Sequence, residues 1–82
     1  MKTETITLRQ EDIRSRNIRE VLQEVSEALT ERGYNAVNQI TGYLITSDPA
    51  YISGYKNART IIQTVERTEI IEELLREFLE NQ

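Results

Sequence analysis

The sequence predicts an all-α protein, a compact bundle of about four to five short helices with a disordered N-terminal tail. Apolar residues recur at three- and four-residue spacing through residues 18–29 and again through 58–79, as is typical of amphipathic helices. Gly33 and Pro49 stand between the periodic stretches, where one helix ends and another begins. Only residues 1–10 alternate as a strand does, and a single short strand has no partner in this chain.

The composition indicates one small domain that must bury further apolar surface to be stable. The chain has 82 residues, is 38% hydrophobic, and contains no Trp and one Phe. A core of this size contributes only about 3–5 kcal/mol, and the absence of Cys excludes a disulfide. We therefore expect a flexible tail over residues 1–10, a single helical domain over residues 11–82, and a homodimer.

The net negative charge and the lack of common catalytic side chains argue against several function classes. The chain has no His and no Cys, and it contains no phosphate loop or nucleophile elbow, so we expect no enzyme, no metal and no cofactor. A net charge of −4 argues against nucleic-acid binding. No stretch approaches the roughly 20 apolar residues of a membrane span, and no signal-peptide core is present. These observations favour a cytoplasmic protein without membrane insertion.

The first predicted helix covers about residues 11–32, and Gly33 is its expected left-handed terminator. Its apolar stripe consists of Ile18, Val21, Leu22, Val25, Ala28 and Leu29. A second helix is expected over about residues 37–46. Gly42 inside it costs roughly 1 kcal/mol relative to Ala, which indicates the close approach of another helix.

Asp48 and Pro49 predict a helix start, because Asp caps the free N–H groups and Pro at the first position loses no hydrogen bond. The same Asp48 is a weak metal candidate, since no His or second carboxylate stands near it in the sequence. A single short turn over residues 50–52 should follow, and the last helical region should begin near Tyr55.

Two apolar stripes in the last region point in different directions. The first consists of Ala58, Ile61, Ile62 and Val65, and the second of Ile70, Ile71, Leu74, Leu75, Phe78 and Leu79. At about 100° per residue they lie half a turn apart. Either the helix kinks near residues 66–69, with Thr68 capping a further helix, or the two faces bury against different chains. Like charges at Glu69, Glu73 and Glu77 predict a solvated acidic face.

Tyrosines and basic residues leave alternatives open. The tyrosines can stack on bases, or they can fill the core with their hydroxyl groups at its edge, and the acidic balance favours the core. Lys56, Arg59 and Arg67 can form a small basic surface, or they can pair with neighbouring acids. In the tail, Thr3, Thr5 and Thr7 offer hydroxyl groups to a kinase. The alternative is a frayed terminus that happens to contain threonine.

Several short motifs carry a family resemblance. They are Gly33-Tyr34-Asn35, Asn38-Gln39-Ile40, Gly42-Tyr43-Leu44, Asp48-Pro49-Ala50-Tyr51-Ile52, Ala58-Arg59, Glu66-Arg67 and Ile70-Ile71-Glu72-Glu73-Leu74. With these motifs the chain resembles the IreB family (also called ReoM) of low-GC Gram-positive bacteria. The resemblance covers nearly the whole chain, loosely before residue 20 and closely from residue 33 onward.

The resemblance implies a helical homodimer whose N-terminal threonine is phosphorylated by the membrane PASTA-domain Ser/Thr kinase, with a cognate phosphatase that reverses the modification. It also implies that the unphosphorylated form is linked to turnover of MurA by the ClpCP protease. Phosphorylation then spares MurA and supports cell-wall synthesis and β-lactam tolerance. The implied role is that of a non-enzymatic regulator.

The resemblance also selects residues. The acid-Thr-apolar context of the target threonine matches Thr5 best, with Thr3 and Thr7 as secondary candidates, and the functional arginines correspond to Arg59 and Arg67. This chain departs from the family pattern at Ala36, Ser47, Ser53-Gly54 and Gln63, where many members have Pro, Gly, Pro-Arg and a basic residue. The implied basic surface is therefore weaker here.

A phosphothreonine adds about −1.5 to −2 charge and three strong acceptors. We expect it to fold the tail onto Arg14, Arg16 and Arg19, to fold it onto Arg59 and Arg67, or to repel an acidic partner. The alternative function is a small helical DNA-binding regulator, since helix-turn-helix modules have this size.

Overall fold

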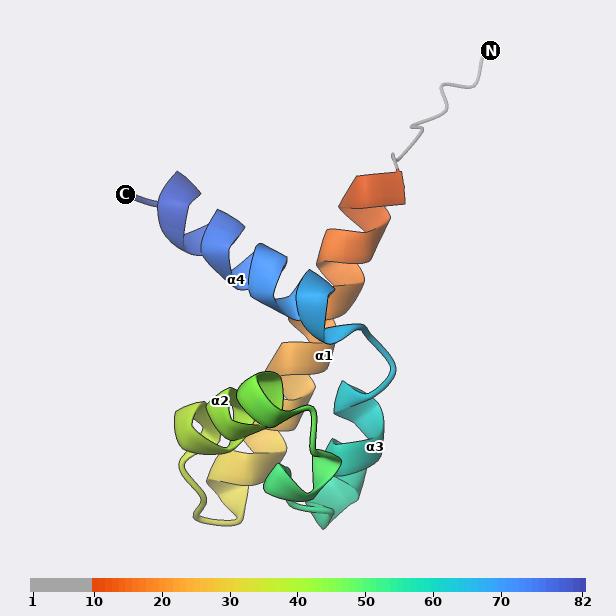
Figure 1. Cartoon of the computed structure of the whole chain (residues 1–82), viewed down its shortest axis with the longest axis vertical. Coiled ribbons are helices and arrows are strands. Elements are labelled where there is room, and N and C mark those ends of the chain that lie inside the picture. Colours follow the sequence, from red (N-terminus) through yellow and green to blue (C-terminus); the bar gives the residue numbers. More distant parts are fainter. Residues whose placement is uncertain (1–9) are drawn as a thin grey trace.

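The computed structural model describes residues 10–82, and the side chains from Asn17 onward. In these residues four α-helices and two short 3-10 helices follow one another, with no strand (Figure 1). Their bounds are α1 (Gln10–Glu31), α2 (Ala36–Thr46), η1 (Pro49–Tyr51), η2 (Tyr55–Asn57), α3 (Ala58–Ile62) and α4 (Arg67–Glu80). The predicted all-α class is confirmed. None of the described helices combines the length and apolar character that a membrane crossing requires.

The predicted tail falls almost wholly outside this part of the chain. Thr3, Thr5 and Thr7 lie outside the described residues, and the tail's last residue, Gln10, already begins α1. The side chains of Arg14 and Arg16 also lie outside what the structure describes.

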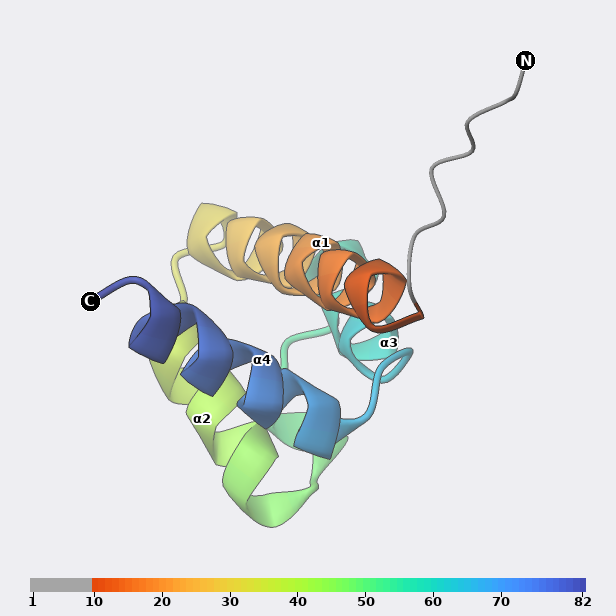
Figure 2. The ribbon, with the colours of Figure 1, turned by 90° about the horizontal axis from the view of Figure 1, so that it is seen from above.

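Helix α1 is the element on which the others pack. Its predicted apolar stripe faces the core, with Val25 and Leu29 completely buried. Helix α3 packs along α1, and α2 and α4 contact it as well (Figure 2). The buried core consists of Ile18, Val21, Val25, Ala28, Leu29, Tyr43, Ile52, Ala58, Ile62, Val65 and Ile70.

The predicted helix ends are confirmed where short-range signals exist. Gly33 adopts a φ of 92°, and the following N–H of Tyr34 donates to the Leu29 carbonyl at 2.9 Å, which closes the end of α1. The Asn35 side chain caps α2 by accepting from the N–H of Asn38 at 3.0 Å. Asp48 accepts from the N–H of Ala50 at 3.0 Å and begins η1, as the capping reading predicts.

Among residues 10–82, three non-glycine residues adopt left-handed backbone conformations that no sequence pattern predicts. Ser47 (φ 66°) ends α2 by donating its N–H to the Tyr43 carbonyl at 2.8 Å. Lys56 and Asn57 (φ 50° and 64°) follow one another directly. For this reason the region from Tyr55 starts as the 3-10 helix η2, and regular α-helix begins only at Ala58.

The kink between the two apolar stripes is confirmed. Helix α3 ends at Ile62 and α4 begins at Arg67, with residues 63–66 between them. The predicted cap at Thr68 was wrong, because extended Glu66 (φ −83°, ψ 144°) occupies the capping position and its carbonyl accepts from Ile70 N at 3.0 Å. Thr68 therefore lies inside α4.

Gly42 is explained by the close approach of another helix, as predicted, and this neighbour is the short 3-10 helix η1. A Cβ added to Gly42 would lie 2.8 Å from Cε1 and 3.0 Å from Cγ of the Tyr51 ring in η1. Real Cβ atoms do not approach other carbon atoms so closely, so the ring occupies the space of a side chain. The ring of Tyr51 thus holds η1 against α2.

We predict that Gly42→Ala destabilises the fold by about 1–3 kcal/mol, because the added methyl must displace the Tyr51 ring. Urea denaturation at fixed protein concentration measures this difference. Gly54→Ala is the matched control. A Cβ added at Gly54 would lie 3.8 Å from its nearest neighbour, Nη1 of Arg59, and the φ of −80° suits Ala. Equal stabilities of the two variants would contradict the packing seen here.

Candidate functional site

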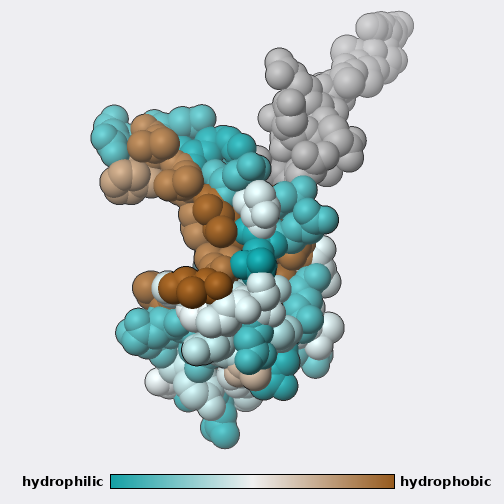
Figure 3. All heavy atoms as spheres, viewed as in Figure 1, coloured by the Kyte–Doolittle hydropathy of each residue, from teal (hydrophilic) through white to brown (hydrophobic). Residues whose placement is uncertain are grey.

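A groove of about 240 Å³ lies between α2 and α4, with α1 as its floor. Its lining is mostly apolar and consists of Leu22, Ser26, Ala36, Val37, Ile40, Thr41, Leu44 and Leu74. Figure 3 shows the hollow and the hydrophobic surface along both of its walls. The inner side of α4 forms one wall of this apolar groove, and α2 forms the other.

The hydrophobic surface extends well beyond the apolar groove. Phe78 on α4 is 67% exposed and Val37 on α2 is 72% exposed. The other large exposed apolar residues of these two helices are Ile45, Ile71, Leu74, Leu75 and Leu79. A contiguous apolar surface on so small a protein typically marks an interaction site.

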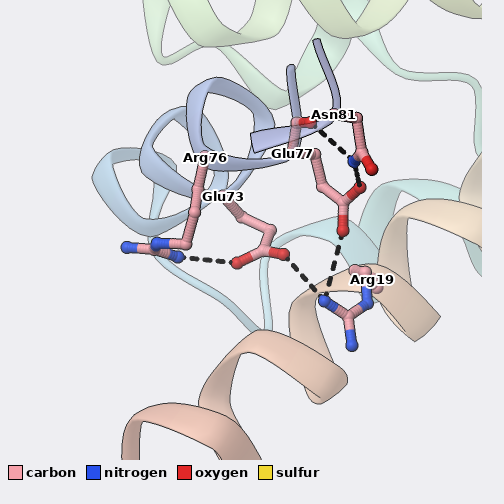
Figure 4. A network of polar contacts seen from close by, with 5 residues as sticks. All are labelled: Arg19, Glu73, Arg76, Glu77 and Asn81. Carbon is pink, nitrogen blue, oxygen red and sulfur yellow. Dashed lines mark hydrogen bonds and ion pairs between the residues drawn. The ribbon is translucent and has the colours of Figure 1, made fainter. Parts of the chain in front are cut away.

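Glu73 is the buried charged residue that holds α4 against α1. Its carboxylate is 2% exposed and accepts from Arg19 at 3.1 Å and from Arg76 at 2.8 Å (Figure 4). Arg19 also reaches Glu77 at 3.4 Å, and Asn81 donates to the other oxygen of Glu77 at 3.0 Å. The predicted solvated face was wrong at Glu73, because α4 crosses α1 at this residue. The sequence shows Arg76 three residues after Glu73 but gives no signal of the distant Arg19.

Arg67 joins the start of α4 to the end of α2. Its Nη1 donates to the Leu44 carbonyl at 2.6 Å, and the side chain is partly buried. The last carbonyls of a helix lack intrahelical donors and carry partial negative charge, so a guanidinium is a well-matched partner.

Lys56 in η2 and Arg59 in α3 lie in another part of the fold. Arg59 Nε donates to the carbonyl of fully buried Ile52 at 2.9 Å. Lys56 pairs with Glu31 at 2.8 Å, and the Tyr55 hydroxyl donates to the same carboxylate at 3.1 Å. The hydrogen bonds and ion pairs described for Lys56 and Arg59 involve other residues than those of Arg67. Their predicted role in partner binding stays a prediction.

The tyrosines divide between the core and the surface. Tyr43 is buried, as the core interpretation predicts, and Tyr55 is half-buried under the cations of Arg32 and Lys56 at 5.5 and 5.7 Å from its ring centre. Tyr34 and Tyr51 are 44% and 49% exposed, so the core interpretation was wrong for these two. Among the described residues no three side chains of His, Cys, Asp or Glu gather as a metal site would require.

Comparison with known proteins identifies the family. The model of the IreB family, described as IreB regulatory phosphoprotein, matches residues 3–80. The chain belongs to this family. It is also 44% identical over 78 residues to a UPF0297 protein of Ruminiclostridium cellulolyticum, covering 95% of this chain and 89% of that protein.

Membership in the IreB family confirms the resemblance that the central motifs indicate, and it assigns the chain to a group described as regulatory phosphoproteins. Several family motifs have structural roles here. Gly33, Asn35 and Asp48 end or begin helices, Gly42 makes room for Tyr51, and Arg67 binds the end of α2.

Glu31 is the carboxylate around which Lys56 and Tyr55 are arranged. The hydrogen bond from Lys56, followed by that from Tyr55, holds the pKa of Glu31 below its usual range, and the same contact with Glu31 raises the pKa of Lys56. A lowered carboxyl pKa stabilises the fold above the ordinary carboxyl pKa. That contribution is lost as the pH falls through the lowered value.

We predict that Lys56→Met returns the pKa of Glu31 toward its ordinary value, because the first cause of the shift is removed. Carboxyl ¹³C NMR during an acid titration measures this pKa directly. Arg32→Met is the control, because Arg32 contacts the Tyr55 ring and has no bond to Glu31 among the described contacts. An unchanged Glu31 pKa in Lys56→Met would show that the pair is not formed in solution.

Proposed function

We propose that this IreB-family protein is a non-enzymatic, cytoplasmic regulator that is phosphorylated on an N-terminal threonine by a PASTA-domain Ser/Thr kinase and dephosphorylated by the cognate phosphatase. In this proposal it controls cell-wall synthesis and β-lactam tolerance through ClpCP-dependent turnover of MurA. The observation that carries the proposal is the family match over residues 3–80, which includes every candidate phosphoacceptor threonine. Thr5 is the first candidate, followed by Thr3 and Thr7.

The described surface suits a protein that binds other proteins. Its hollow is lined mainly by apolar side chains, and its exposed face on α4 carries large apolar residues. Lys56 pairs with the carboxylate of Glu31, which offsets its charge, and the chain carries a net charge of −4, so a nucleic acid would meet little positive charge. The DNA-binding alternative therefore has less support than the protein-binding one.

A second copy of the chain is the partner we propose for the exposed face of α4. A domain of 82 residues gains limited stability from its own core, and burying Phe78, Leu75 and Leu79 between two copies would add to it. Two identical faces can pair about a two-fold axis, which is the commonest arrangement of homodimers.

For the kinase step we predict one phosphate on the wild-type chain after incubation with a PASTA kinase domain and ATP, and none on Thr5→Ala. Intact-mass spectrometry measures this. A phosphate retained by Thr5→Ala would move the site to Thr3 or Thr7 and keep the proposed function. Wild-type protein that takes up no phosphate would overturn the kinase part of the proposal.

For the dimer we predict that Phe78→Glu is largely monomeric at concentrations where the wild type is dimeric, because a charge would be buried in the apolar interface. Sedimentation equilibrium measures the mass. Gln63→Glu is the control, since it adds the same charge at an exposed position of the turn after α3. If Phe78→Glu remains as dimeric as the control, α4 is not the interface.

A further inference from the structure

Polar contacts of the described residues attach α4 to two different helices. Glu73 attaches it to α1 through Arg19, whereas Arg67 attaches it to α2 through the Leu44 carbonyl. Leu44 also lines the apolar groove, and Leu74 lines it from the α4 side. The bond from Arg67 thus joins the two walls of the apolar groove at one end.

We propose that Arg67 is a positioning residue that sets the separation of α2 and α4, and with it the width of the apolar groove. Its consequence for docking a second copy rests on the proposed function. This geometry gives Arg67 a way to act without touching a partner.

Because the bond lies at the start of α4, a small rotation there moves the far end of the helix by a larger distance. Arg67 is the first residue of α4, which has 14 residues and is therefore about 21 Å long. A rotation of about 10° at this end moves the far end by about 3–4 Å. Beyond Glu73 the side chains of Leu75, Phe78 and Leu79 are largely exposed. The ion pairs of Arg19 with Glu73 and Glu77 are therefore the main described contacts that oppose such a movement.

The chemistry of the contact suits a fixed spacer. The bond is short, at 2.6 Å, and joins a charged donor to a carbonyl in the last turn of α2. The neighbouring carbonyls of Gly42 and Tyr43 accept from Thr46 Oγ1 and Ser47 N. Loss of the guanidinium would remove this side-chain donor from the Leu44 carbonyl, and with it a direct polar link between α2 and α4.

The test measures the distance between α2 and α4 in the free chain. The protein contains no Cys, so spin labels can be placed at Asn38→Cys and Glu80→Cys, both exposed, without removing native thiols. Labelled chain is diluted into excess unlabelled chain, so that double electron–electron resonance reports the distance between the two labels within one protomer. A second pair, Glu24→Cys and Thr60→Cys, reports the spacing of α1 and α3, which Arg67 does not contact.

Arg67→Met keeps the apolar stem and removes every donor. We expect the α2–α4 distance to shift or broaden by about 3 Å, the α1–α3 distance to stay unchanged, and the dimer dissociation constant to rise about tenfold. Arg32→Met removes the same charge away from the apolar groove and should leave both distances as they are. An unchanged α2–α4 distance in Arg67→Met would overturn the proposal.

A measurement on the wild type guards against a variant that does not fold. Rotation of the Arg67 guanidinium, followed by ¹⁵N NMR, should be slowed by its bond to Leu44 relative to exposed Arg32. Free rotation of Arg67 would also overturn the proposal. If the wild type is monomeric, the proposed dimer fails, whereas the distance measurement still decides the role of Arg67.

Discussion

Burial of the Glu73 carboxylate is the constraint on which the shape of this molecule depends. A charge removed from water is tolerated only with close partners, and Glu73 has Arg19 on α1 and Arg76 on its own helix. Helix α4 must therefore cross α1 where Arg19 can reach it. With that side turned to α1, the apolar residues of α4 after Ile70 are left to face the apolar groove and the solvent.

One end of α4 therefore packs in the core, whereas the other end leaves apolar side chains exposed. Ile70 is completely buried and contributes to the core, while Phe78 near the other end is 67% exposed. A single small domain has too few elements to cover both stripes of the region from Ala58 to Leu79. The uncovered stripe is a source of binding energy that only another molecule can use.

The elements that the sequence predicts correctly are those whose signals are local. The periodic stripe of α1, the terminator Gly33 and the cap Asp48 each depend on residues within a few positions of one another. The kink after α3 was predictable because the two stripes cannot share one straight helix. Helix class and approximate bounds follow from such patterns alone.

Contacts between distant residues account for what sequence reasoning missed. Nothing near Glu73 indicates Arg19, and nothing near Arg67 indicates that its partner is the carbonyl of Leu44. The left-handed backbone at Lys56 goes against the preference of Lys, and no short sequence motif predicts it. The candidate threonines of the phosphorylation proposal were chosen from their sequence context and the family resemblance, and they stay a prediction.

The packing of Tyr51 against Gly42 has a consequence for how this sequence can diverge. Glycine is required at position 42 by the aromatic ring that fills the space above it, and its backbone freedom is not needed there. A descendant that replaces the tyrosine with a small side chain would free position 42 to accept alanine, with its better helix propensity. The two positions should therefore change together during evolution, and a change at either one alone should be rare.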